Sequence, residues 1–461
     1  METIQNILSE QNAFFKTQQT KNVAYRLQLL KALRTEIRAN EEAFLDALHL
    51  DFKKSAFESY LSEFALIISE LNLAIKKLKQ WSKPKRVRSS ILLFPSTDYI
   101  YNEPYGIVLI IAPWNYPFLL ALDPLIMAVA AGNTVVLKPS ELTPNTSTLI
   151  TKIIANVFPK TVAISLEGGV DLASQLLKQR WDYIFFTGST RVGKIVYEAA
   201  AKNLTPVTLE LGGKSPCIID NTVDLKLVAR RLVWGKFLNA GQTCIAPDYV
   251  LAKNSIKSEL IEALKKEITK SYGANPKQSE DFPRIINTQN FKRLKALLDY
   301  DHVALGGETE ETHNYIAPTI MDDPGISSPV MNEEIFGPIL PILSFETRDD
   351  ITSIINSIEK PLSFYIFSKN KSFIQNLIAA HSFGGGVIND TLIHFGNNRL
   401  PFGGVGTSGL GKYHGKYGFE TFSNQKPIVK RGTWFDPRLR YAPYKNKIAL
   451  IRKIFKYLGV F

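Results

Sequence analysis

The sequence predicts an α/β protein with more than one domain. The chain has 461 residues, which exceeds the length that usually forms a single hydrophobic core. From residue 106 onward, short β-rich runs alternate with helix-like segments, as they do when a parallel sheet is covered by helices. A content of 45% hydrophobic and 21% charged residues is typical of a soluble globular chain.

Three kinds of segment follow one another along the chain. The first 80 residues carry apolar residues three and four apart, which predicts helices. Residues 90–104 predict an extended ribbon. Two series of predicted strands then follow, each able to form a parallel sheet: GIVLIIAP, NTVVLKP, TVAISLEG, YIFFTGS and PVTLELGG from residue 106, and YVLAK, YIAPTI, PILPILSF, LSFYIFSK and GGVIND from residue 249.

The composition indicates a reduced, cytoplasmic compartment. Residues 1–20 mix polar and charged residues with apolar ones, so they offer no apolar core of a secretory signal. The longest apolar stretch, residues 105–132, contains Asn115, Asp123 and three prolines, which argues against a membrane span. The chain has two cysteines, Cys217 and Cys244, so a disulfide framework is not expected.

The net charge of +12 is concentrated near the C-terminus. Residues 426–461 hold ten Lys or Arg residues against one acid, Asp436. Six apolar residues recur there at helical spacing between the basic ones, which predicts a basic amphipathic helix: Ile448, Ile451, Ile454, Phe455, Leu458 and Phe461. Two interpretations stay open, peripheral contact with an anionic membrane and docking on the protein or a partner subunit. No nucleic-acid-binding motif accompanies this tail or the basic run 76–88, so a nucleic-acid partner is not expected.

One stretch has the spacing of a phosphate loop. YIFFTGSTRVGK places Gly188, Gly193 and Lys194 as in a nucleotide triphosphate site, but the next residue is Ile195 where the magnesium-binding hydroxyl is needed. A triphosphatase is therefore excluded. The strand-to-helix turn and Ser189 can still bind another phosphate at the positive end of a helix.

A second stretch matches the dinucleotide fingerprint only by its letters. GVGTSG at residues 404–409 follows no convincing strand and precedes no helix pattern, so we interpret it as a flexible loop. Further upstream, Lys138 and Glu141 follow a predicted strand, at the edge of the sheet where ligands bind. A carboxylate there can accept hydrogen bonds from an adenosine ribose, although a surface ion pair is the alternative.

Three residues have the chemistry for acyl transfer. A thiolate of Cys244 can attack a carbonyl, a carboxylate of Glu210 can activate water, and the amide of Asn115 can stabilise an oxyanion. Taken singly, each has an ordinary structural explanation: a buried hydrophobe, an ion-pair partner and a turn residue.

Together, these segments resemble an NAD(P)-dependent aldehyde dehydrogenase. The motifs PWNYP, LKPSE, FTGSTRVG, LELGGK, GQTC, EEIFGP and LPFGGVGTSGLG occur in the order found in that family. The short N-terminus, GGGVINDTLIHF and YHGKYGFETFS are most similar to the class 3, fatty-aldehyde-type branch. Nearly the whole chain takes part in the resemblance.

The resemblance implies a role for each motif. Cys244 would be the nucleophile, Glu210 the general base, and Asn115 with the Cys244 backbone amide the oxyanion hole. The cofactor would be NAD, with NADP also tolerated in this branch, and no metal is implied. Its contacts would be Trp114, Lys138, Glu141, Gly188, Ser189, Thr190, Arg191, Val192, Gly193, Glu334 and Phe336. Lys194 would then be an ordinary helix residue.

The same resemblance implies an architecture and a partner. The chain would contain a Rossmann-type cofactor domain (1–82 and 106–210), an α/β catalytic domain (211–395), a small β oligomerisation arm (83–105 and 396–431) and the basic tail (432–461). Two such chains would form a homodimer. The substrate would be a medium- or long-chain aliphatic or aromatic aldehyde, near Tyr116 and Phe395. A coenzyme A-acylating dehydrogenase and a non-catalytic membrane-associated relative are the alternatives. The expected location stays cytoplasmic, and the basic tail leaves peripheral contact with the inner membrane face open.

Overall fold

The computed structural model describes residues 3–459 and divides into two compact units. Unit 1 comprises Met1–Ser82 and Glu103–Asn424, and unit 2 comprises Lys83–Asn102 and Gln425–Phe461. Each unit has its own sheet structure and is described separately below.

The chain begins with helices, as predicted from the spacing of its apolar residues. The Asn22 side chain caps one of them by accepting from the Ala24 and Tyr25 amides, which leaves fewer unpaired donors at the helix start. A π-helical turn, Tyr60–Phe64, joins two others. The helices are α1 (Ile4–Lys16), α2 (Val23–Ala39), α3 (Glu41–Phe52), α4 (Ala56–Ser59) and α5 (Ala65–Trp81).

The first series of predicted strands forms one six-stranded sheet in unit 1. Its order is β17-β7-β6-β3-β4-β5, and all neighbours are parallel except β17 and β7. The strands are β3 (Ile107–Ile111), β4 (Thr134–Lys138), β5 (Ala163–Ser165), β6 (Tyr183–Thr187), β7 (Val207–Glu210) and β17 (Gly409–Leu410). All residues of β3, β4 and β6 are buried, which explains why they read as continuous apolar runs.

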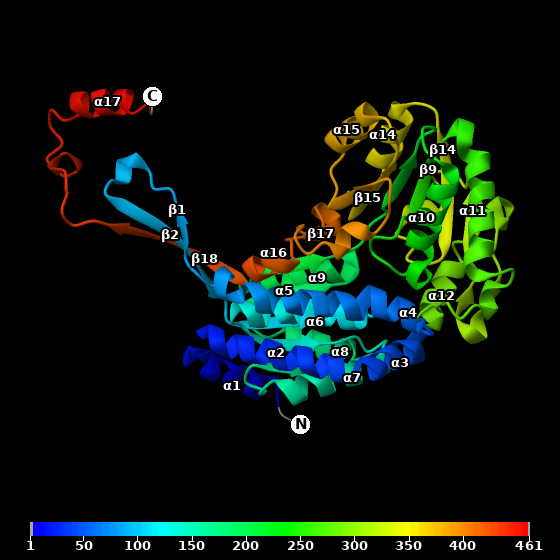
Figure 1. Cartoon of the computed structure of the whole chain (residues 1–461), viewed down its shortest axis with the longest axis horizontal. Coiled ribbons are helices and arrows are strands. Elements are labelled where there is room, and N and C mark those ends of the chain that lie inside the picture. Colours follow the sequence, from blue (N-terminus) through cyan, green and yellow to red (C-terminus); the bar gives the residue numbers. More distant parts are fainter. Residues whose placement is uncertain (1–2, 460–461) are drawn as a thin grey trace. The chain divides into compact units, whose positions relative to one another are not determined.

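The helices of this sheet follow from local sequence signals. α6 (Pro117–Ala131) begins with proline at its first position, ends at Gly132 with φ of +99°, and is buried over its whole length. It lies beside α5 (Figure 1). The other helices that connect these strands are α7 (Pro144–Val157), α8 (Val170–Leu177) and α9 (Thr190–Ala201).

The strand order places a switch point between β3 and β6. From β3 the chain continues outward to β4 and β5, and then returns to the other side of β3 as β6 and β7. The carboxyl ends of parallel strands at such a point form the crevice in which open α/β sheets bind ligands. The segments after β3, β4, β6 and β7 therefore meet at one edge of the sheet.

The second series forms a seven-stranded sheet, also in unit 1. Its order is β10-β13-β14-β9-β8-β15-β16, and all neighbours are parallel except β10 and β13. The strands are β8 (Pro216–Ile219), β9 (Tyr249–Lys253), β10 (Val303–Leu305), β13 (Thr319–Asp322), β14 (Ile339–Phe345), β15 (Ser363–Phe367) and β16 (Gly385–Ile388). A separate pair contains β11 (Thr309–Glu310) and β12 (Tyr315–Ile316).

Helices accompany this second sheet as well. Two of them, α10 (Leu225–Phe237) and α11 (Lys257–Tyr272), lie side by side (Figure 1). The remaining helices of unit 1 are α12 (Thr288–Lys295), α13 (Pro329–Asn332), α14 (Arg348–Asn356), α15 (Lys371–Ala380) and α16 (Gly415–Thr421). The second predicted α/β series is thus confirmed as a sheet of its own.

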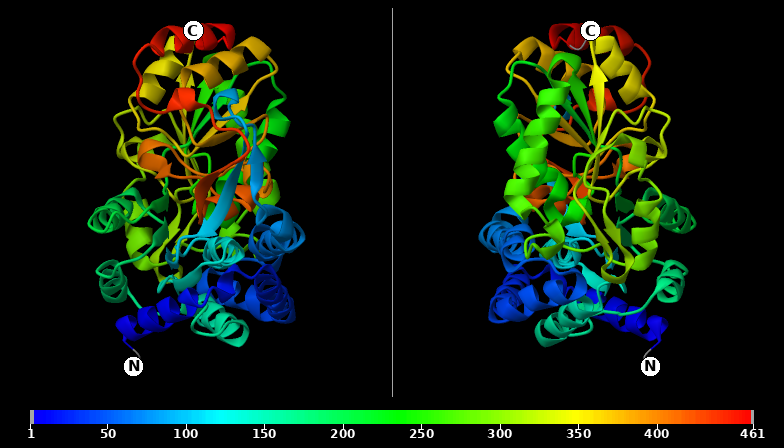
Figure 2. Two further views of the ribbon diagram at one scale, coloured as in Figure 1. Left: turned by 90° about the vertical axis from the view of Figure 1, so that its left-hand side faces the viewer. Right: turned by 90° about the vertical axis from the view of Figure 1, so that its right-hand side faces the viewer.

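A three-stranded sheet of order β1-β2-β18 brings together segments far apart in the sequence. Its strands are β1 (Lys85–Val87), β2 (Ser96–Pro104) and β18 (Ser423–Arg431), and β2 and β18 run beside each other in Figure 2. The ribbon predicted over residues 90–104 is shorter than expected, because Ile91–Leu93 form a 3₁₀ turn capped by Ser90.

The predicted basic helix is present as α17 (Ile448–Tyr457). Phe461, which was included in its apolar pattern, lies outside the described residues. Within residues 3–459, no helix is long and apolar enough to cross a membrane.

Candidate active site

Cys244 lies in the segment that leads into β9, at the end of a tightly constrained turn. The preceding 3₁₀ segment Leu238–Gly241 has Asn239 and Ala240 in the left-handed region, both with φ of +52°. Cys244 as a whole residue is partly exposed, but its thiol group is buried. Burial raises the pKa of this thiol, and the carboxyl groups of Glu334 and Glu210 raise it further.

Glu210 is the last residue of β7, where the strand meets the crevice. Neither of its carboxylate oxygens has a hydrogen-bond partner among the described residues, although both are buried. Burial raises the pKa of this carboxyl well above its ordinary value, and the nearby Lys412 ammonium opposes that shift. A buried, unpartnered carboxyl group is suited to binding a proton from water.

Asn115 follows β3 and lies across from the Cys244 segment. Its side-chain amide donates to the backbone carbonyl of Gln242 over 3.1 Å. A carboxamide nitrogen carries two N–H groups, so this bond leaves a second donor for a ligand. Next to it, the Tyr116 hydroxyl and the Thr243 hydroxyl are 2.7 Å apart.

A cavity of about 330 Å³ opens beside Cys244. As predicted, Tyr116 and Phe395 line it, and its other walls are mostly aliphatic or aromatic, including Leu119, Leu120, Trp234 and Ile393. One carboxylic acid, Glu58, also lies in the wall. A cavity of this size and polarity suits an extended apolar chain.

The turn after β6 has the features of a dinucleotide phosphate site. Ser189 caps α9 by accepting from the Val192 amide over 3.4 Å, which orients the first turn of the helix toward the crevice. A Cβ atom on Gly193 would lie 2.6 Å from Leu211 Cδ2, so a larger residue there would displace the Leu211 side chain. Thr190 and Arg191 complete this first turn, and the Thr190 hydroxyl donates to the Thr407 carbonyl over 3.1 Å.

Lys138 and Glu141 form an ion pair just past β4. Lys138 is buried, whereas the Glu141 carboxylate is about one-third exposed. The ion-pair alternative is therefore observed, and it is compatible with ribose binding because the exposed carboxylate still has free lone pairs.

Glu334, which the resemblance puts at the nicotinamide ribose, lies against Gly212. A Cβ atom on Gly212 would collide with the Glu334 carboxylate, which shows how closely that side chain approaches the backbone. Burial raises the pKa of Glu334 to about 8. The rings of Trp114 and Phe336 meet edge to face, with centroids 5.4 Å apart. The glycine turn, the capped helix and these side chains together fit a dinucleotide cofactor.

A cavity of about 580 Å³ lies beside these residues, lined by Thr190, Lys194, Gly212, Glu334 and Thr407 among others. Lys194 is part of α9, as expected, but it also faces this cavity.

The GVGTSG stretch does not form the strand-to-helix turn of a dinucleotide fingerprint. Gly406–Ser408 form a 3₁₀ turn and Gly409–Leu410 form β17, which pairs with β7 so that Gly409 lies opposite Glu210. The interpretation as a flexible loop therefore holds only for its first residues, because its last residue is paired with the strand that carries Glu210.

Sequence reasoning missed two residues of the site, Lys412 and Glu58. Lys412 donates to the Gly384 carbonyl over 3.2 Å and also contacts the Gly403 carbonyl, which places its charge near Glu210. Glu58 accepts from the Asn239 amide over 2.8 Å. Neither of them belongs to a motif with a known chemistry. A charged residue inside a helical apolar pattern, as at Glu58, was the one available signal.

Comparison with known proteins gives consistent matches. Residues 1–428 match the model of the aldehyde dehydrogenase family. The chain is 46% identical over 458 residues to the 4,4'-diaponeurosporen-aldehyde dehydrogenase of Staphylococcus aureus, covering 99% of this chain and 100% of that protein. It is also 46% identical over 431 residues to aldehyde dehydrogenase family 3 member A2 of Macaca fascicularis, covering 93% of this chain and 89% of that protein.

Solved structures agree on the fold. A substrate-bound structure of Staphylococcus aureus AldH has a TM-score of 0.96 at 46% identity and covers 99% of this chain and 100% of that chain. An NAD-dependent aldehyde dehydrogenase from Sinorhizobium meliloti has a TM-score of 0.85 at 28% identity, covering 94% of this chain and 88% of that chain.

Proposed function

The chain belongs to the aldehyde dehydrogenase family, and from that premise we propose that Cys244, Glu210 and Asn115 carry out its reaction, the oxidation of an aldehyde. The observation that supports this assignment most is the unpartnered, buried Glu210 carboxylate near the Cys244 thiol. The products of this reaction are a carboxylic acid and a reduced nicotinamide.

The first half of the reaction forms a thioester. The Cys244 thiolate attacks the carbonyl carbon, so that a C–S bond forms and the carbonyl electrons move to oxygen. The second N–H of the Asn115 amide and the Cys244 backbone amide stabilise this oxyanion. The oxyanion electrons then re-form the carbonyl as hydride leaves this carbon, and a bound nicotinamide cofactor would supply the hydride acceptor.

The second half releases the acid. Glu210 takes a proton from water, the resulting hydroxide attacks the thioester carbon, and the C–S bond breaks to return the Cys244 thiolate. The raised pKa of Glu210 makes it a stronger base than an exposed glutamate.

Residues beyond β4 and β6 would hold the cofactor. The first turn of α9 with Gly188, Ser189 and Val192 would bind the pyrophosphate, and Glu141 with Lys138 would bind the adenosine ribose. The Glu141 carboxylate favours NAD over NADP, because it would repel a 2′-phosphate. Glu334, Phe336 and Trp114 would surround the nicotinamide riboside.

The apolar cavity favours a medium- or long-chain aliphatic or aromatic aldehyde. Its volume of about 330 Å³ suits a chain larger than acetaldehyde, and most of the residues that line it are apolar. The relative named for 4,4'-diaponeurosporen-aldehyde supports a substrate of this apolar class.

An assay with one matched control tests the assignment. Purified protein, NAD and a series of aliphatic aldehydes should give reduced nicotinamide and the free acid without coenzyme A. Cys244→Ala should abolish this activity. The matched control, Cys217→Ala, replaces the other cysteine, which is buried in β8, and should retain the activity. Product formation that requires coenzyme A would favour an acylating dehydrogenase instead, although such enzymes lack the base that Glu210 provides.

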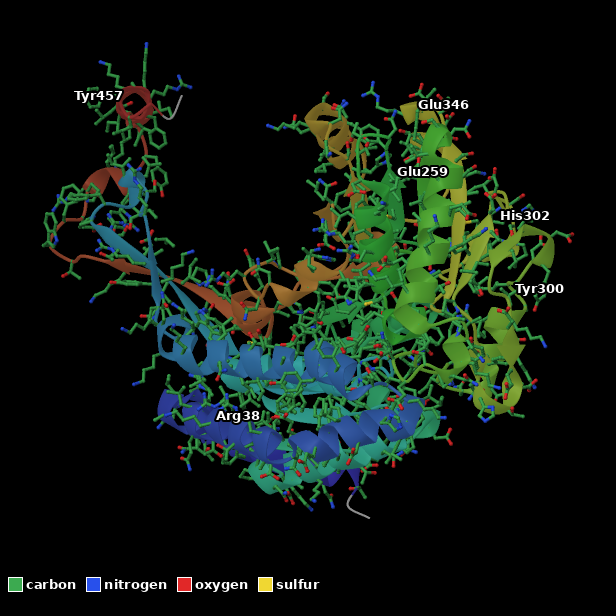
Figure 3. All side chains as sticks on the ribbon, turned by 45° about the vertical axis from the view of Figure 1, so that its right-hand side comes forward. Arg38, Glu259, Tyr300, His302, Glu346 and Tyr457 are labelled. Atoms are coloured by element: carbon green, nitrogen blue, oxygen red, sulfur yellow. The ribbon has the colours of Figure 1, made fainter. Side chains whose placement is uncertain are left out.

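The charge distribution supports a second proposal, peripheral contact of unit 2 with an anionic membrane. Unit 2 contains fourteen Lys or Arg residues and two acids, so it carries the whole formal charge of +12, and unit 1 is balanced. None of the described residues of α17 is buried, and Tyr457, whose side chain projects from this helix in Figure 3, is 92% exposed. A neutral second copy of unit 1 offers no comparable charge attraction.

Vesicle sedimentation tests this contact with the full chain. We expect binding to phosphatidylglycerol vesicles and not to phosphatidylcholine vesicles. Replacing Arg452, Lys453 and Lys456 by Gln should weaken binding, whereas replacing Lys265, Lys266 and Lys270 of α11 by Gln should not. Equal loss in both variants would contradict the proposal.

By resemblance to the family we also propose a homodimer, in which residues 90–104 and 426–431 extend sheets across the subunits. Light scattering of the purified chain gives the mass directly, and a monomer of 51.7 kDa would contradict it.

A further inference from the structure

Glu58 is an unexpected residue in the wall of the substrate cavity. It lies on α4, is 7% exposed and faces a cavity whose other walls are mostly apolar. A carboxyl group in such a wall is costly unless it makes specific hydrogen bonds. The contacts of Glu58 therefore indicate what it does.

Glu58 holds the turn that precedes Cys244. Its Oε1 atom accepts from the backbone amide of Asn239 over 2.8 Å. Asn239 and Ala240 both have left-handed backbone conformations, which asparagine adopts more readily than most residues and alanine adopts rarely. The hydrogen bond that Glu58 accepts comes from the amide of Asn239, the first of these two residues.

Asn239 in turn holds Asn115. The Asn239 side-chain amide donates to the Asn115 backbone carbonyl over 2.8 Å and to the Gln242 carbonyl over 3.2 Å. That same Gln242 carbonyl accepts the Asn115 side-chain amide. Gln242 closes the turn by donating from its backbone and its side chain to the Asn239 carbonyl, over 3.1 Å and 3.0 Å. The orientation of the Asn115 amide thus depends on Asn239.

The segment that carries Glu58 also anchors the start of α6, which follows Asn115 in the chain. Glu63 forms a buried ion pair with Lys54 at 2.9 Å. Its second oxygen accepts from the Phe118 and Leu119 amides, over 3.0 Å and 3.2 Å, at the start of α6. Residues 54–63 therefore anchor both the turn before Cys244 and the helix that begins after Tyr116.

We propose that Glu58 is a positioning residue of the oxyanion hole, which acts through Asn239 on the side-chain amide of Asn115. Its hydrogen bond keeps the left-handed turn in place, and this turn fixes the carbonyl groups that orient the amide. The inference rests on the proposed role of Asn115 as oxyanion donor.

A double-mutant cycle tests the inference in the full-length enzyme. Glu58→Ala removes the acceptor, Glu58→Gln keeps an oxygen acceptor in the same place, and Asn115→Ala removes the donor. The measured quantities are kcat and KM for a long-chain aldehyde and the Kd of NAD. If Glu58→Ala gives no folded protein, Glu58→Asp, which shortens the reach by one methylene, takes its place.

We expect Glu58→Ala to lower kcat by about tenfold with little change in the Kd of NAD, and Glu58→Gln to stay within about twofold of the wild type. In the Asn115→Ala background, Glu58→Ala should lower kcat no further. An independent, multiplicative loss in that background, or an equal loss for Gln and Ala at position 58, would overturn the inference. Full activity of Asn115→Ala itself would instead refute the oxyanion role under the proposed function.

Discussion

The side-chain amide of Asn239 donates a hydrogen bond to the backbone carbonyl of Asn115 across 2.8 Å. Asn115 follows β3 of the six-stranded sheet, and Asn239 lies in the segment that leads to Cys244 and β9 of the seven-stranded sheet. This bond therefore joins the two sheets of unit 1 where the proposed nucleophile and oxyanion donor meet. Chemistry at this site depends on how firmly the two segments are held.

Asn115→Ala is expected to lower kcat/KM for aldehyde oxidation by about 10²- to 10³-fold, because one oxyanion donor is lost. The affinity for NAD should not change, since the proposed phosphate and ribose contacts come from α9 and from residues after β4. Steady-state kinetics and NAD fluorescence titration measure the two effects. A loss confined to NAD affinity would contradict the assignment.

Glu141→Gln is expected to shift cofactor preference toward NADP. The Glu141 carboxylate is partly exposed and paired with Lys138, so its repulsion of a 2′-phosphate is moderated by solvent and by that lysine. We expect the ratio of kcat/KM for NADP over NAD to rise by about three- to tenfold. An unchanged ratio would show that Glu141 does not face the ribose.

Activity is expected to rise with pH on its acidic side. Burial raises the pKa of both the Cys244 thiol and the Glu210 carboxyl, and both groups react in their deprotonated forms. Because Lys412 lowers the pKa of Glu210, Lys412→Met should raise that pKa and move the rise in kcat to higher pH. A shift of the kcat profile to lower pH in this variant would contradict the role of Lys412.

Glu58 should make stability depend on pH. Burial raises its pKa from 4.5 to about 7, with Lys54 and the Asn239 amide opposing the shift and Glu63 and Asp281 adding to it. Between these values the folded state binds more protons than the unfolded chain, so the free energy of unfolding falls as pH rises.

Glu58→Gln removes this dependence. Its free energy of unfolding relative to the wild type should therefore increase by about 3 kcal/mol between pH 4.5 and pH 7. Urea unfolding at several pH values measures the difference. A difference that stays constant over this range would show that Glu58 titrates normally.

The regular elements could be predicted because their signals are local. Continuous apolar runs mark β3, β4 and β6, and proline at the first position marks the start of α6 and α7. Three of the motifs that resemble the family, PWNYP, LKPSE and FTGSTRVG, lie at the ends of these strands. Cys244 and Glu210 could be proposed as site residues from the resemblance alone.

The supporting residues could not be predicted, because their roles come from tertiary contacts. Asparagine tolerates a left-handed backbone, but nothing in the sequence indicates that the Asn239 amide donates to Glu58, on a helix 181 residues away. In the same way, GVGTSG matches a fingerprint by its letters, whereas its pairing with β7 depends on the sheet being formed. Long-range bonds of this kind leave no periodic pattern.

The most direct test of the central claim is a rapid-mixing measurement on Glu210→Gln with NAD and a long-chain aldehyde. If Cys244 forms a thioester that Glu210 hydrolyses, this variant should produce one reduced nicotinamide per subunit in a burst and then stop. Mass spectrometry should find the acyl group on the peptide that contains Cys244. Continued turnover at the wild-type rate, or a burst with no acyl group on that peptide, would contradict the account.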